Sequence, residues 1–128
     1  MNKINWNNTI IGGVIGTFAF DIFGFFFTAT WWEIPWLLIE KTSFGVAYGV
    51  FSQFLIGVLL AIIYAGIAPS LWGSTWFKSL FFVTAETIAL VWFFMFPLLG
   101  ACISGTRIAE FIPLISLVRH MAYGAPVW

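Results

Sequence analysis

Four apolar runs, each close to the roughly 20 residues that an α-helix needs to cross a bilayer, constrain this chain more than any other feature. We place them at residues 9–28, 44–67, 78–101 and 108–127. The rest of the chain is too short for a soluble domain. The sequence therefore predicts one transmembrane domain, residues 1–128, that folds as an all-α, integral membrane four-helix bundle with short loops and with both termini on the same side.

Composition and charge exclude several classes of partner. Hydrophobic residues make up 62% of the chain and charged residues 8%, whereas about a quarter of the residues in a typical soluble protein are charged. The formal net charge is zero and no run of basic residues is present. The sequence thus predicts neither nucleic acid nor an anionic surface as a partner. The lipid bilayer is the expected partner, and we expect the protein in a bacterial inner membrane, with lipids bound to it.

Small residues repeat at every fourth position in the first two runs. Residues four apart share one face of a helix, and small side chains on that face allow another helix to approach closely. The series are Gly12 and Gly16, then Gly13, Thr17 and Asp21, and in the second run Gly49, Gln53, Gly57 and Ala61. We expect these faces to pack inside the bundle; an interface between two copies is the alternative.

Polar residues interrupt every apolar run. Counting about 1.5 Å of rise per residue from each expected helix start puts Asp21, Gln53, Glu86 and Arg119 near the midplane of the bilayer. The full polar layer consists of Asp21, Gln53, Glu86, Arg119, His120 and Tyr123. A charge at the bilayer centre costs at least about 2.5 kcal/mol, which favours pairing. Within the layer, Arg119 could bridge Asp21 and Glu86.

The polar layer has two interpretations. An intramembrane acid beside a cation couples many transporters to protons, which predicts a small transporter or channel using Asp21, Glu86 and Arg119. The alternative is a cluster that holds the four helices in register, in which each interhelical hydrogen bond contributes about 0.6 kcal/mol. No unwound helix and no repeated half are visible in the sequence, which favours the structural interpretation.

His120 also has two interpretations. Ser116 and Gly124 lie one turn before and after it, so a planar macrocycle could approach and take the imidazole as axial ligand to haem iron or chlorophyll magnesium. A lone histidine is also typical of a neutral side chain hydrogen-bonded to a neighbour such as Glu86, and Tyr123 could complete that network. No other metal ligand is predicted. The candidate cofactors are therefore haem, a quinone or a pigment.

Tryptophans gather in the connections between the runs, as they do at membrane interfaces. The loop 29–43 contains Trp31, Trp32 and Trp36, and the turn after the second run contains Trp72 and Trp76. We expect the loop to anchor one face of the domain and the turn to anchor the other. The basic residues divide evenly between the faces, so they predict no orientation.

Three short motifs mark the runs: IIGGVIGT at the start of the first, FPLLG at the end of the third and HMAYG in the fourth. Together they resemble a group of small bacterial four-pass membrane proteins of unknown function. The resemblance implies a four-helix bundle and carries no activity. In the second run, Ser52 and Gln53 stand where that group often has a histidine, which argues against a paired-histidine cofactor site.

No phosphate-binding loop, metal-ligand spacing or nucleophile beside a base is visible, so we expect no enzyme. Our main hypothesis is a non-enzymatic accessory or scaffold subunit that packs in the bilayer against other membrane subunits or as a homo-oligomer, because almost nothing protrudes from the membrane. The alternatives are the small transporter or channel, and a binder of haem, quinone or pigment at His120.

Overall fold

The computed structural model describes residues 3–31, 35–36, 39 and 43–127, and these residues form helices and turns with no β-strand among them. The helices are α1 (Trp6–Thr28), α3 (Val46–Ile67), α4 (Thr75–Glu86), α5 (Phe96–Leu98) and α6 (Ile112–Val127). A π-helical segment, Thr87–Met95, joins α4 to α5, and 3-10 turns lie at Ala68–Ser70 and Ile103–Gly105. The prediction of an all-α protein is confirmed for this part of the chain.

Three helical stretches are long and apolar enough to cross a membrane: Trp6–Thr28, Val46–Ser70 and Thr75–Leu98. They correspond to the first three predicted spans. α1 begins three residues before the predicted span because the side chain of Asn5 caps it, accepting a hydrogen bond from the backbone N–H of Asn8 at 3.2 Å.

The predicted fourth span, 108–127, begins four residues too early. α6 has 16 residues, which rise about 24 Å, less than the roughly 30 Å of a hydrocarbon core. The residues before it turn sharply, because Gly100, Cys102, Ser104 and Gly105 all have positive φ angles. The third span correspondingly ends at Leu98. A complete fourth crossing therefore remains a prediction.

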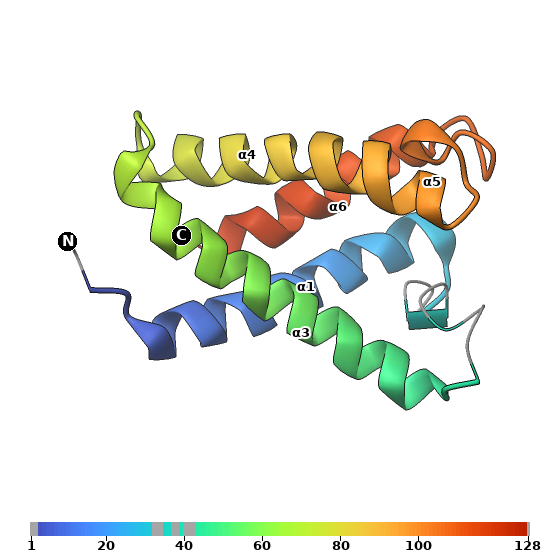
Figure 1. Ribbon diagram of the computed structural model, residues 1–128, viewed down its shortest axis with the longest axis horizontal. Helices are drawn as coiled ribbons and strands as arrows, with labels where there is room; N and C mark the ends of the chain where they lie inside the picture. Colours follow the sequence, from blue (N-terminus) through green and yellow to red (C-terminus); the bar gives the residue numbers. More distant parts are fainter. Residues whose placement is uncertain (1–2, 32–34, 37–38, 40–42, 128) are drawn as a thin grey trace.

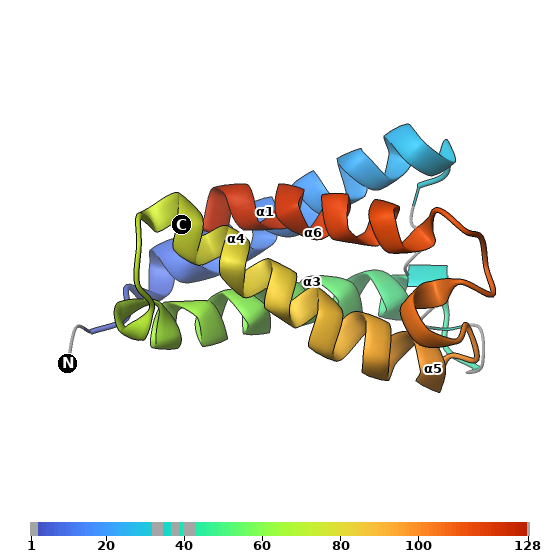
Figure 2. The ribbon, with the colours of Figure 1, turned by 90° about the horizontal axis from the view of Figure 1, so that it is seen from above.

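The helices cross one another in a compact bundle (Figure 1). α1 packs against both α3 and α6, and α4 packs against α6. α1 begins and α6 ends at the same end of the molecule, which is also where the chain turns from α3 into α4 (Figures 1 and 2). From that turn, α3 and α4 diverge toward the opposite end (Figure 1).

Glycines allow α1 to approach its two neighbours. A Cβ at Gly13 would lie 2.8 Å from the Cα of Val58 in α3, and a Cβ at Gly57 would overlap the hydroxyl of Thr17. A Cβ at Gly16 would lie 2.8 Å from the ring of Tyr123 in α6. Gly13, Gly16 and Gly57 thus face neighbouring helices of the same chain.

The same faces are buried. The buried residues of α1 are Gly12, Gly13, Gly16, Thr17, Asp21 and Gly24. The buried residues of α3 are Gly49, Gln53, Gly57, Ala61 and Tyr64. Four of these five are the series that recurs every fourth position in the sequence, so the pattern locates the packed face of α3.

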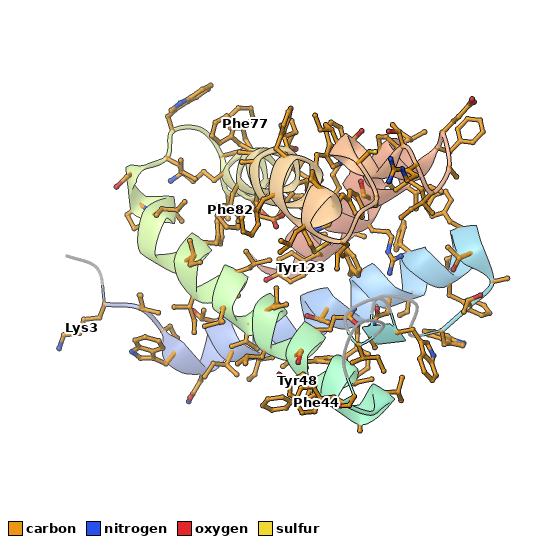
Figure 3. The ribbon with its side chains drawn as sticks, turned by 45° about the vertical axis from the view of Figure 1, so that its right-hand side comes forward. Lys3, Phe44, Tyr48, Phe77, Phe82 and Tyr123 are labelled. Carbon is orange, nitrogen blue, oxygen red and sulfur yellow. The ribbon has the colours of Figure 1, made fainter. Side chains whose placement is uncertain are left out.

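A hydrophobic cluster closes the end at which α3 turns into α4. It contains Tyr64, Phe82, Val83 and Tyr123, and the rings of Tyr64 and Phe82 lie 5.4 Å apart. Figure 3 shows Phe82 and Tyr123 pointing between the helices, whereas Phe77 lies on the outer side of α4. Among the described helices, α3 and α4 therefore meet at this end without extensive contact further along.

The expected interfacial tryptophans are largely exposed. Trp31, Trp36, Trp72 and Trp76 are 48%, 58%, 72% and 52% exposed, and Trp32 lies outside the described residues. Pro35, from the same loop as Trp36, is buried, and its carbonyl lies where a Cβ at Gly49 would stand. Part of the loop 29–43 therefore packs onto the first turns of α3.

Candidate functional site

The π-helical segment decides which side chains of the third helical stretch face the interior. In an α-helix, residues five apart are rotated by about 140°, but π-helical hydrogen bonds join residues five apart and bring them toward one face. One such bond runs from the Phe96 N–H to the Val91 carbonyl. Glu86, Val91 and Phe96, which are five apart, all line the same pocket.

This pocket lies among α1, α3, the π-helical segment and α6, and has a volume of about 350 Å³. Its size falls within the range of about 300–1,000 Å³ that is common for small-molecule sites. Its apolar lining includes Ile56, Leu60, Val91, Met95, Phe96, Ile112 and Ile115. Its polar lining includes Gln53, Glu86, Ser116, Arg119 and His120. The lining residues come from α3 on one side and from Glu86 and the π-helical segment on the other.

The first polar cluster joins α1, α3 and α6. The Gln53 amide donates a hydrogen bond of 2.6 Å to the Asp21 carboxylate, and the Arg119 guanidinium lies 3.9 Å from the same carboxylate oxygen. The guanidinium carbon also stands 4.1 Å from the centre of the Phe20 ring. Because Gly24 has no side chain, Arg119 can lie directly against α1.

The second polar cluster pairs Glu86 of α4 with His120 of α6. His120 Nδ1 lies 2.7 Å from the Ser116 carbonyl oxygen; a carbonyl can only accept, so Nδ1 carries the hydrogen. His120 Nε2 then faces Glu86 Oε2 at 3.7 Å. The suggested bridge from Arg119 to both acids is thus not the arrangement that the structure shows: Arg119 faces Asp21, and Glu86 faces the histidine.

Trp92 ties the π-helical segment to α6. Its indole N–H donates to the Ser116 hydroxyl at 2.9 Å, and that hydroxyl donates to the Pro113 carbonyl at 2.9 Å. Since the Ser116 carbonyl accepts from His120, Trp92 supports the segment that orients the imidazole. Sequence reasoning missed Trp92, because an α-helical projection gives no reason to turn it toward α6.

Tyr123 links α6 to α3 and not to the Glu86–His120 pair. Its hydroxyl donates to the Gly57 carbonyl at 2.5 Å, and its ring lies against Gly16 of α1. The Tyr123 hydroxyl thus makes a contact between helices, and its role in completing a network with His120 stays a prediction. The position of the Tyr123 ring leaves no room for a side chain at residue 16.

The structure thus brings all six residues of the polar layer into one region but divides them into separate clusters. Their depth in a bilayer stays a prediction. Within the part of the chain that the structure describes, no three His, Cys, Asp or Glu side chains lie close enough together to hold a metal ion. Comparison with protein-family models, with curated proteins and with solved structures found no match for the chain.

Proposed function

We propose that this protein binds a lipophilic ligand in the membrane, in the pocket between α3 and the π-helical segment, without catalysing a reaction on it. The observation that carries the proposal is a pocket of about 350 Å³ with apolar walls and a polar end at Glu86 and His120. Ligand sites commonly combine apolar walls with a few polar groups that fix orientation. This corresponds to the binder of haem, quinone or pigment at His120.

The backbone around the pocket supports the same proposal. π-helical turns are rare, usually a single turn long, and frequent at functional sites. Here the π-helical stretch covers nine residues, Thr87–Met95, and it supplies Val91 and Met95 to the wall. A regular α-helix would turn part of this wall away from the pocket.

The proposal includes the arrangement in the membrane. α1, α3 and α4 with its continuation cross the bilayer, and α6 crosses as a shorter fourth helix. Both termini then lie on one side, consistent with α1 beginning and α6 ending at the same end of the molecule (Figure 2). In a bacterial inner membrane, the space between α3 and the π-helical segment would open sideways toward the lipid, so a ligand can enter without passing through water.

Solvent extraction of the purified protein, followed by mass spectrometry, tests the proposal. A lipophile should be enriched over the bulk lipids of the same preparation. Ile115 lines the pocket, so the bulky indole of Ile115→Trp should abolish the enrichment. Leu114→Trp is the matched control, because Leu114 is the adjacent residue and is 60% exposed. No enrichment in the wild-type protein, or equal enrichment in all three, would contradict the proposal.

A second candidate function is the accessory subunit that packs against another membrane subunit or a second copy. Large apolar side chains are exposed along the connection between α5 and α6, much of which is not helical, and on the adjoining helix ends. They are Leu98, Ile103, Ile108, Phe111 and Leu114. Non-helical backbone is disfavoured against lipid tails, so covering by protein would stabilise this end.

Isolation in a mild detergent separates this candidate from the first. An accessory subunit should be recovered with partners in fixed stoichiometry, and Phe111→Ser should release them because Phe111 is 70% exposed. Phe26→Ser, at the 77%-exposed Phe26 of α1, is the matched control. A solitary monomer that carries an enriched lipophile would favour the binding protein.

A further inference from the structure

We infer that the ligand enters the pocket headgroup first and that this headgroup is neutral and carries a ring carbonyl or hydroxyl, as in a quinone or quinol, held between Glu86 and His120. The inference rests on the proposed function, because it names the class of ligand for the same pocket. Four features of the site carry it: the distance between the pair, the charges, the position of the polar end and the room at Nε2.

The Glu86–His120 pair has the geometry of an open hydrogen-bonding site. Its facing atoms, Oε2 and Nε2, are 3.7 Å apart, longer than the range of about 2.7–3.2 Å for a hydrogen bond. Nδ1 is directed to the Ser116 carbonyl, so the remaining capacity of the ring lies on the Glu86 side. A ligand oxygen beside this gap can lie within hydrogen-bond distance of both groups. A carbonyl oxygen would accept from the pair, and a hydroxyl would donate to it.

The charges around the pocket favour a neutral headgroup. The Arg119 guanidinium faces the Asp21 carboxylate at 3.9 Å, so these two residues contribute no net charge. Glu86 and His120 also have no net charge when they hold one proton between them. Among the described residues that line the pocket, no surplus positive charge is then present for a carboxylate or phosphate headgroup, whose transfer into apolar surroundings is unfavourable.

The position of the polar end favours entry by the headgroup. Arg119 and His120 lie seven and eight residues after Ile112 on α6, or about 10–12 Å further along the helix. Ile112 and Phe96 belong to the apolar part of the wall. A lipid tail that entered first would place its methyl end against Glu86 and His120. A neutral ring entering first instead satisfies these groups and leaves its chain against Phe96 and Ile112.

Haem fits less well. An iron atom on His120 Nε2 would have to share the 3.7 Å space between that nitrogen and the Glu86 carboxyl. A haem also carries two propionate groups, which meet the same shortage of positive charge. The quinone class therefore fits both the available room and the charges.

Calorimetric titration of delipidated protein in detergent tests the inference with ligands that share a ten-carbon chain. The probes are decyl-1,4-benzoquinone, n-decane and decanoate, with hemin added separately. We expect the quinone to bind at least tenfold more tightly than decane or decanoate. Glu86→Leu and His120→Asn should weaken quinone binding at least tenfold and leave decane binding unchanged. Ile115→Trp should abolish the binding of both.

The infrared carbonyl stretch of the bound quinone needs no variant. Hydrogen bonding to the pair should lower its frequency relative to the same quinone in detergent alone. This measurement therefore tests the hydrogen bond to the headgroup even if the variants do not fold. An unshifted stretch, equal affinity for decane and quinone, preference for decanoate, or hemin binding that His120→Asn removes would each overturn the inference. The proposed function survives those results, whereas it fails if no probe binds, or if Ile115→Trp binds every probe as the wild type does.

Discussion

Two sides of α3 differ in how they meet their neighbours. Toward α1, the helix presents Gly57 and Ala61, and the backbones approach until a Cβ at Gly57 would overlap Thr17. Toward the π-helical segment, it presents Ile56 and Leu60, which line a pocket. On the first side, small residues allow the two backbones to approach closely. On the second side, large residues line the pocket.

The residues of the polar layer also divide between these two sides. Asp21 and Gln53 bind one another directly where α1 packs against α3, and Gln53 also lines the pocket. Glu86 and His120 face each other across the pocket side at a longer distance. The first cluster is therefore suited to fixing the helices, as a structural interpretation of the polar layer requires, and the second to meeting a ligand. Substitutions on the two sides should accordingly differ in their effects on stability and on binding.

The largest effect is expected from Arg119→Leu on the packed side. The change removes the guanidinium that faces the buried Asp21 carboxylate at 3.9 Å, and breaking such a pair costs about 3–5 kcal/mol. We expect loss of the monodisperse peak in size-exclusion chromatography or a large fall in melting temperature. Arg107→Leu is the control, because Arg107 is exposed and its side chain donates to the Gly100 carbonyl at 3.3 Å. Normal folding of Arg119→Leu would show that the packed side does not depend on this cluster.

A smaller effect is expected from Gly57→Ala. The added methyl group meets the Thr17 side chain of α1, and overpacking of this kind costs about 1–3 kcal/mol. Gly66→Ala places the same group on the same helix, where no atom lies within 4 Å, and should be neutral or stabilise by up to about 1 kcal/mol. Thermal unfolding in one detergent measures both. If Gly57→Ala and Gly66→Ala had equal melting temperatures, the close packing of α3 against α1 would not distinguish that side of the helix.

The smallest effect is expected from Trp92→Phe on the pocket side. It removes the hydrogen bond from the indole to Ser116, which contributes about 0.5–1.5 kcal/mol. The helices should remain assembled while ligand affinity falls, because His120 is held through the same serine. Trp72→Phe, at a residue that is 72% exposed, should change neither. A fall in stability as large as that of Arg119→Leu would mean that the pocket side also holds the fold.

The sequence was most informative where a regular α-helix holds. The four-residue spacing of Gly49, Gln53, Gly57 and Ala61 identified the face of α3 that is buried. The apolar runs placed the three long helices because length and composition alone decide that question. Asp21 was placed on the packed face of α1 by the same spacing, and it is buried there.

The prediction was incomplete where the backbone departs from that period. No pattern in residues 87–95 predicts π-helical hydrogen bonds. The sequence therefore did not predict that Glu86, Val91 and Phe96 share one face. The positive φ angles of Cys102 and Ser104 are unusual for those residue types, and they account for the late start of α6. Counting depth along straight helices did not distinguish Arg119 from its neighbour His120, which is the residue that faces Glu86.

Photocrosslinking tests the central claim most directly. A decyl-1,4-benzoquinone with a diazirine on its chain would be activated on the purified protein, and the labelled peptides identified by mass spectrometry. We expect labels on the π-helical segment, Thr87–Met95, and on the first turns of α6, and excess unlabelled quinone should suppress them. Labels spread over exposed positions such as Phe26 and Phe51, with no suppression by unlabelled quinone, would contradict it.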